Sequence, residues 1–311
     1  MPRSHALASI NSTNVRFMAS LGAQRLALRA SSAVTPELAG LWAERLFLTP
    51  PRPRMPASEL FGVINAQAGS IQHRGRRLAV WRWGDPDAPA VLLAHGWGGR
   101  ALQLQAFVQP LLKAGYRVIG YDQLAHGLSQ GRLTGLPDMA DALATVAGVE
   151  VGVHAVIAHS LGATGAALAA AQGLPVARIV MVSPPSDMVG YSRRFARWHW
   201  MPERIRSAMQ AAIEERYGLR WSELELARIA PRLKPAALVI HDREDRMVPA
   251  KQGARFARAW KGARLLHTTG LGHGRILTDR AVIEAAIDFV HGGTGGAGVV
   301  GLHFPIPAPL Y

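Results

Sequence analysis

The chain contains no cysteine among its 311 residues. Disulfides and a thiol nucleophile are therefore excluded, and the sequence leaves the redox state of its compartment undetermined. Acidic residues are also scarce, since 21 Asp and Glu stand against 35 Lys and Arg, which gives a formal net charge of +14 at pH 7. No apolar run reaches the roughly 18 residues of a membrane-spanning helix, so we expect no transmembrane segment.

Clusters of potential metal ligands are missing as well. The 12 histidines are scattered, and no tight group of His, Asp and Glu has the spacing of a zinc site. We therefore expect neither a metal nor a cofactor. Only four of the basic residues are lysines, and the arginines are dispersed along the chain without a nucleic-acid-binding motif beside them. The sequence accordingly predicts no specific nucleic-acid partner, although the net charge favours association with anionic surfaces.

The N-terminal segment, residues 1–33, contains Arg3, Arg16, Arg25 and Arg29 but no acidic residue. Organelle transit peptides have such a composition, but we favour an amphipathic N-terminal helix. We expect a cytoplasmic protein. Organelle targeting, or attachment to a membrane surface through this segment, is the alternative.

A serine at the end of an apolar run is the most informative feature of the chain. Residues 153–158 read as a buried strand, and Ser160 follows one residue later, with Gly162 two positions beyond it. This layout is typical of a nucleophile elbow, in which a strand turns into a helix so sharply that only small neighbours fit. Ala158 occupies the first small position, where glycine is usual. A serine that caps a helix is the alternative interpretation.

Candidates for a base, an acid and an oxyanion turn each follow a further apolar run. His273 lies in a glycine-rich turn, and Asp242 and Asp245 both follow the run that precedes it. Upstream, another run leads into the glycine-rich turn 95–99, which can direct backbone N–H groups at a developing oxyanion. The sequence therefore supplies every part of a serine hydrolase site, with two candidates for the acid.

In this order of motifs the chain resembles the α/β-hydrolase fold family, of the esterase, lipase and thioesterase type, over roughly residues 68–291. The matching motifs are His95-Gly96-Trp97-Gly98-Gly99, Tyr121-Asp122 with Ala125-His126-Gly127-Leu128-Ser129, and the acid turn from His241 through Asp245 to Val248-Pro249. Asp242, like Ala158, stands where the family usually has glycine. The register of the Val248-Pro249 pair favours Asp245 over Asp242 as the acid.

The resemblance implies a role for each residue. Ser160 is expected to be the nucleophile, His273 the general base and Asp245 the acid that orients it. The backbone N–H groups of Trp97 and Leu161 are expected to form the oxyanion hole, and the Trp97 indole to line the acyl pocket.

These roles predict a serine hydrolase that cleaves a small-molecule carboxylic ester or thioester through an acyl-enzyme intermediate. The alternatives are a noncatalytic binding scaffold of the same fold and a basic peripheral binder of membrane or nucleic acid. The sequence indicates neither the leaving group, nor the acyl-chain length, nor the oligomeric state.

The fold class predicted from the alternation of elements is α/β, a mostly parallel eight-stranded sheet flanked by helices and carrying a helical cap insertion. The strand candidates lie near residues 71–72, 78–83, 91–94, 117–121, 153–158, 178–182, 236–240 and 263–267. A helix is expected after Thr35 and Pro36, with one apolar face. That face comprises Leu38, Leu41, Trp42 and Leu46.

The expected division of the chain follows from these elements: an N-terminal helical extension and Pro-rich linker at 1–66, the hydrolase core at 67–185 and 233–291, the cap at 186–232 and a flexible tail at 292–311. In the cap, Trp198 and Trp200 are candidates for acyl binding, with packing of the insertion on its own domain as the alternative.

Four histidines have structural interpretations. His159 is expected to point away from Ser160, and His126 to lie in a structural loop. His154 and His241 are expected to be satisfied histidines within strands.

Overall fold

The computed structural model describes residues 35–53 and 65–295. These residues form two compact units, a larger one of residues 48–53, 65–187 and 222–295 and a smaller one of residues 35–47 and 188–221. The helix expected within residues 1–33 lies outside the described residues, as does the tail after residue 295. Among the described helices, none combines the length and the apolar character needed to cross a membrane.

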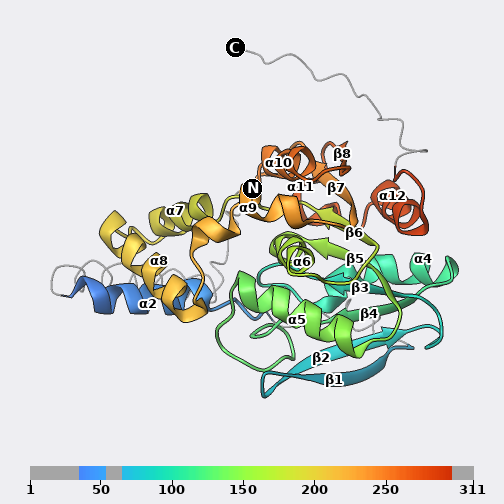
Figure 1. Ribbon diagram of the computed structural model, residues 1–311, viewed down its shortest axis with the longest axis horizontal. Helices are drawn as coiled ribbons and strands as arrows, with labels where there is room; N and C mark the ends of the chain where they lie inside the picture. Colours follow the sequence, from blue (N-terminus) through green and yellow to red (C-terminus); the bar gives the residue numbers. More distant parts are fainter. Residues whose placement is uncertain (1–34, 54–64, 296–311) are drawn as a thin grey trace, which may run out of the picture. The chain divides into compact units, whose positions relative to one another are not determined.

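An eight-stranded sheet forms the centre of the larger unit, in the order β1-β2-β4-β3-β5-β6-β7-β8 (Figure 1). Only β2 runs against its neighbours, and the other pairs are parallel. The strands are β1 Gln67–His73, β2 Arg76–Trp83, β3 Ala90–Ala94, β4 Arg117–Tyr121, β5 Val153–His159, β6 Arg178–Val182, β7 Ala236–Asp242 and β8 Arg264–Thr268. The predicted fold class, an α/β fold with a mostly parallel eight-stranded sheet, is confirmed.

Helices cover both faces of this sheet, which explains why β3 and β4 are buried along their whole length and read as apolar runs. On one face, alternate residues of the central strands pack against the helices α4 and α12. The opposite residues face the other side, because side chains alternate along a strand. The helices of this unit are η2 Ala101–Phe107, α4 Val108–Lys113, α5 Leu136–Val149, α6 Leu161–Ala171, α9 Leu226–Ile229, η4 Ala230–Arg232, α10 Lys251–Ala259, α11 Gly272–Arg275 and α12 Arg280–His291.

Helix α6 is buried at every one of its positions. Its sequence, LGATGAALAAA, is almost entirely small residues, which lets its backbone approach the neighbouring chain closely. At Gly165 a side chain would lie 3.3 Å from the Cβ of Met139 in α5. Helix α6, which begins directly after the candidate nucleophile Ser160, is therefore held in place by the close approach of its backbone to neighbouring elements.

The smaller unit consists of α2 Pro36–Leu48, α7 Met188–Trp198 and α8 Glu203–Tyr217, and the short helix η3 Trp221–Leu224 begins at its last residue. Phe47 of α2 joins α2 to α7, because its ring lies 5.7 Å from that of Tyr191 and 5.1 Å from that of Phe195. A carboxylate of Glu44 pairs with Arg216 of α8. The segment predicted as a cap, 186–232, is thus divided, with residues 188–221 grouped with α2 and the remainder with the larger unit.

The apolar face expected on α2 is not the face that α2 buries. Leu38 and Leu41 are 62% and 47% exposed, whereas Ala39, Ala43 and Phe47 are buried. Gly40, on this buried face, lies so close to Ala208 of α8 that a side chain there would be 2.6 Å from its Cβ. Small residues, which carry a weak hydrophobic signal, therefore set the orientation of this helix together with Phe47.

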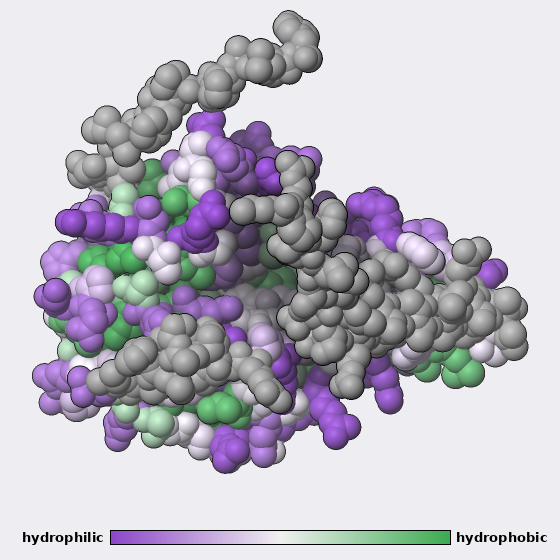
Figure 2. All heavy atoms as spheres, turned by 180° about the vertical axis from the view of Figure 1, so that it is seen from behind, coloured by the Kyte–Doolittle hydropathy of each residue, from purple (hydrophilic) through white to green (hydrophobic). Residues whose placement is uncertain are grey.

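The surface of the larger unit carries no single dominant patch in the view of Figure 2. Hydrophilic and hydrophobic residues are interspersed over the visible face wherever grey atoms do not cover it (Figure 2). Such a mixture is ordinary for a protein surface, so this view does not point to a contact site.

Candidate active site

The turn from β5 into α6 places Ser160 in a strained conformation, with φ 53° and ψ −128°. The left-handed region is costly for residues other than glycine, and it occurs mostly where the surroundings enforce it. Two of the surrounding glycines are required by space. A side chain at Gly96 would lie 2.7 Å from the Ser160 Cβ, and one at Gly162 would collide with the carbonyl oxygen of His95. The elbow that the sequence predicted is therefore present.

Ala158, the departure from the usual glycine, fits without disturbing the sheet. It is fully buried, and it pairs in register with Ala94 of β3 and Met181 of β6. The backbone N–H of Ser160 donates to the carbonyl of Val182 at 2.8 Å. The strand therefore continues its hydrogen bonding up to the serine.

The structure brings Ser160, His273 and Asp245 together from three separate strand ends. The Nε2 atom of His273 lies 3.0 Å from the Ser160 Oγ, and its Nδ1 lies 2.7 Å from Oδ2 of Asp245. An ionised carboxylate can only accept, so Nδ1 carries the proton and, in the neutral ring, Nε2 is left to accept one from the serine. The three side chains form a continuous chain of hydrogen bonds.

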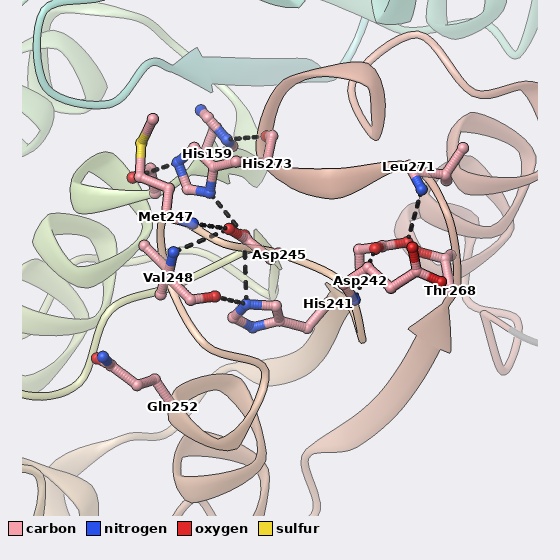
Figure 3. A network of polar contacts seen from close by, with 12 residues as sticks. His159, His241, Asp242, Asp245, Met247, Val248, Gln252, Thr268, Leu271 and His273 are labelled. Atoms are coloured by element: carbon pink, nitrogen blue, oxygen red, sulfur yellow. Dashed lines mark hydrogen bonds and ion pairs between the residues drawn. The ribbon is translucent and has the colours of Figure 1, made fainter. Parts of the chain in front are cut away.

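Asp245 is held in its ionised form by its partners. Its Oδ1 accepts the backbone N–H groups of Met247 and Val248, both at 2.8 Å. Burial acts to raise the pKa of this carboxyl, but hydrogen bonds from His241, His273 and Val248 outweigh burial and hold the pKa well below its usual range. His241 is fully buried, and its Nε2 lies 3.5 Å from Oδ2 of Asp245 (Figure 3). A stable negative charge therefore faces His273.

Asp242, the other candidate acid, is hydrogen-bonded to groups other than the His273 ring. Its Oδ2 accepts the hydroxyl of Thr268 at 2.7 Å and the N–H of Leu271 at 3.0 Å, while its Oδ1 accepts the N–H of Glu244 at 2.9 Å. Figure 3 shows it beside Thr268 and Leu271, apart from the His273 ring. Burial acts to raise its pKa, but the hydrogen bonds leave that pKa lowered. Of the two acids, Asp245 is the one that bonds to the His273 side chain.

His159 contacts His273, the candidate base, although its position in the sequence did not predict that contact. Its ring lies 4.6 Å from the ring of His273, and its Nε2 is 3.0 Å from the His273 carbonyl oxygen. Its direction relative to Ser160, expected to be away, stays a prediction. Burial, and then the nearby charge of His273, lower the pKa of His159 to about 3. The only sequence signal for this contact was its place beside the serine.

The glycine-rich turn at 95–99 is held by two buried histidines. The N–H of Gly98 donates to Nε2 of His126 at 2.9 Å, and the N–H of Gln123 donates to Nε2 of His95 at 2.9 Å. Both imidazoles must be neutral to accept. Burial is the main cause that lowers the pKa of His95 to about 4 and that of His126 to about 3. The ring of Trp97, within this turn, lies 5.5 Å from that of His126.

The other predicted site residues have the following positions. Leu161 is the first residue of α6, directly after the serine. Trp198 and Trp200 belong to the smaller unit, and each is 57% exposed. Their roles, like those of the Trp97 and Leu161 N–H groups, stay predictions. Within the ranges 35–53 and 65–295, no group of three or more His, Asp or Glu side chains is arranged to hold a metal ion.

Comparison with known proteins agrees with this geometry. A family model described as the alpha/beta hydrolase fold matches residues 89–206, which include the turn at Trp97 and the elbow at Ser160. The chain has the α/β-hydrolase fold, and its matches support the esterase or lipase type within it. Its matches identify it as an enzyme of the hydrolase class.

Two curated relatives resemble this α/β-hydrolase. A bifunctional esterase/perhydrolase of Acinetobacter calcoaceticus is 23% identical over 257 residues, 65% of this chain and 91% of that protein. A carbamate hydrolase, so named provisionally, of Variovorax paradoxus is 35% identical over 116 residues, which cover 36% of this chain and 44% of that protein.

Solved structures of low sequence identity share the fold. An esterase of Pyrococcus furiosus superposes with a TM-score of 0.61 at 20% identity, covering 78% of this chain and 98% of the esterase. A thioesterase domain from the curacin biosynthetic pathway superposes with a TM-score of 0.53 at 17% identity, covering 73% of this chain and 99% of the domain.

Proposed function

We propose that this α/β-hydrolase is a serine hydrolase that cleaves a small-molecule carboxylic ester or thioester through an acyl-enzyme intermediate. The observation that carries the proposal is the chain of hydrogen bonds from Asp245 to His273 to Ser160, at 2.7 and 3.0 Å. The esterase among the relatives and the thioesterase domain among the structures support both leaving groups.

The first half of the reaction forms the acyl-enzyme. His273 Nε2 takes the Ser160 proton as Oγ attacks the carbonyl carbon, and Asp245 stabilises the imidazolium that results. The negative charge that develops on the carbonyl oxygen is proposed to lie against the N–H groups of Trp97 and Leu161. The imidazolium then protonates the departing alcohol or thiol as its bond to carbon breaks.

The second half releases the acid. A water molecule gives a proton to His273 and attacks the acyl carbon, and the intermediate collapses as the proton returns to Ser160 Oγ. The enzyme is thereby restored, and the carboxylic acid leaves. The buried carboxylate of Asp245 keeps its charge throughout, in agreement with its lowered pKa.

Replacing the serine tests the proposal. Ser160→Ala should abolish labelling by a fluorophosphonate probe and lower the rate of hydrolysis of p-nitrophenyl esters and acyl-thioesters by about four orders of magnitude or more, the scale of losing a member of a triad. The matched control is Ser222→Ala, at an exposed serine, which should label and turn over as the wild type does. Full activity in a folded Ser160→Ala variant would falsify the assignment.

A further inference from the structure

The turn that carries His273 needs support from outside itself. It runs from the end of β8 at Thr268 to the start of α11 at Gly272, and both Gly270 and Gly272 have positive φ, 82° and 65°. Glycine populates many backbone conformations, so a turn with two of them is mobile unless neighbouring groups restrain it. The position of the His273 ring therefore depends on what its backbone is bonded to.

Asp242 restrains one side of this turn. Its carboxylate, at the end of β7, is fully buried and accepts the Thr268 hydroxyl at 2.7 Å and the Leu271 N–H at 3.0 Å. The N–H of Gly272, the residue before His273, also bonds to it. Since a buried carboxylate requires such donors, the turn and the carboxylate stabilise one another.

His159 restrains the other side. Its Nε2 lies 3.0 Å from the carbonyl oxygen of His273. A carbonyl only accepts, so Nε2 carries the proton and the tautomer of His159 is fixed. The side chain is 7% exposed, and its ring lies 4.6 Å from that of His273, which limits how far the base can move toward β5.

We propose that Asp242 and His159 are positioning residues that hold the His273 turn from its two sides and thereby set the distance from the base to Ser160; we call the pair the His273 clamp. The inference rests on the proposed function of His273. Asp242 precedes the acid by three residues and His159 precedes the nucleophile by one, so the clamp ties the base to the two strands that carry its partners. Asp242 stands where the family usually has glycine. A glycine has no carboxylate, so the Asp242 half of the clamp is a feature of this sequence and not of the usual family pattern.

Five variants test the clamp. His159→Phe keeps a ring but removes the donor, whereas His159→Gln keeps an N–H that can reach the carbonyl. Asp242→Asn keeps the shape but removes the charge and places an amide donor among backbone donors. Thr268→Val removes one of the bonds to Asp242, and Thr268→Ser keeps its hydroxyl.

The readout is the alignment of the base, measured in two ways. One is the second-order rate constant for fluorophosphonate labelling of Ser160, together with the fraction finally labelled. The other is the division of the effect between kcat and KM with a p-nitrophenyl ester. We expect His159→Phe and Asp242→Asn to lower kcat and the labelling rate constant about 10- to 100-fold, the scale of a displacement of about 1 Å, with KM and the labelled fraction little changed. Thr268→Val, which removes the hydroxyl bond to Asp242, should lower the same two quantities in the same direction. His159→Gln should recover most of the loss of His159→Phe, and Thr268→Ser should show little of the loss of Thr268→Val.

Matched controls separate positioning from stability. His154 lies on the same strand as His159, and its Nε2 also bonds a backbone carbonyl, that of Val290, at 3.0 Å. Asp279 accepts the Val282 N–H at the start of α12. His154→Phe should lower Tm, whereas Asp279→Asn keeps an oxygen for the Val282 N–H and should change Tm little. In both variants kcat and the labelling rate constant should stay at wild-type values.

Two results would overturn the clamp. One is wild-type labelling rate constants in His159→Phe and Asp242→Asn, including the case in which only the labelled fraction falls. The other is a His159→Gln variant as impaired as His159→Phe. Should Asp242→Asn not fold, Thr268→Val against Thr268→Ser decides the Asp242 side in the same way. Failure of the proposed function is distinct, because the wild type itself would then not be labelled at Ser160.

Discussion

Two neighbouring aspartates with different partners allow a test at the level of single residues. Asp245→Asn should lower kcat about 10⁴-fold, because an amide N–H facing Nδ1 would favour the His273 tautomer that cannot accept the serine proton. Asp242→Asn should cost at most about 100-fold, because it disturbs the turn and not the tautomer. Steady-state kinetics of the two variants measure the ranking, with thermal melts to show that both are folded. The opposite ranking would move the orienting role to Asp242.

The limits of sequence reasoning are clear at these residues. The register of the Val248-Pro249 pair indicated Asp245, and the structure places that carboxylate 2.7 Å from His273 Nδ1. The contact of His159 with His273 could not be read from the sequence, because it joins residues whose separation is 114 positions and is made to a backbone carbonyl. Every residue has a backbone carbonyl, so a bond to one leaves no signal in the sequence.

Among the elements, the strands were predictable and the orientation of α2 was not. Strands such as β4 and β6 begin and end at the predicted residues, because strands buried on both faces are nearly continuous apolar runs. In α2 the leucines defined a face, but Gly40 and the alanines allow the close approach to α8 and bury the other face. The packing of this helix therefore combines the close backbone approach at Gly40 with the buried Phe47 ring, and the exposed leucines take little part in it.

We propose that Trp198 and Trp200, in the segment predicted as a cap (186–232), select acyl groups. Trp198→Ala and Trp200→Ala should shift the preferred chain length by a graded amount, about fourfold per methylene, since one buried methylene contributes about 0.8 kcal/mol. A series of p-nitrophenyl esters of increasing chain length measures the profile, while fluorophosphonate labelling should be unchanged.

Trp221→Ala is the control for these variants, because the Trp221 indole is buried and lies 6.0 Å from the Phe47 ring. It should lower Tm and leave the chain-length profile as it is. If Trp198→Ala and Trp200→Ala behave like the control, those two tryptophans serve packing alone.

For the molecule as a whole, the buried histidines predict how stability depends on pH. The pKa values of His95, His126 and His159 are lowered to about 4, 3 and 3, chiefly by burial. An unfolded histidine has a pKa near 6.5, so between about pH 6.5 and 4 the unfolded chain binds protons that the folded chain does not. This contribution to stability is complete above about pH 6.5 and is lost as the pH falls, by up to about 1.4 kcal/mol per pH unit for each histidine.

Urea unfolding at pH 7, 6 and 5 measures this loss. His126→Gln, which keeps an acceptor for the Gly98 N–H, should flatten the dependence by removing one titrating group. Asp122 acts in the opposite direction, because burial raises its pKa. A free energy of unfolding that does not change between pH 7 and 5 would contradict the prediction.

The smaller unit is built from two pieces of chain that are separated by residues 48–187. Helix α2 leaves the ribosome first, yet the rings that pack on Phe47 belong to Tyr191, Phe195 and Trp221. At synthesis rates of about 5–20 residues per second, α2 waits on the order of ten seconds for its partners. During that interval its apolar residues are exposed to chaperones, and the smaller unit can form only after synthesis has passed β6 and reached Trp221.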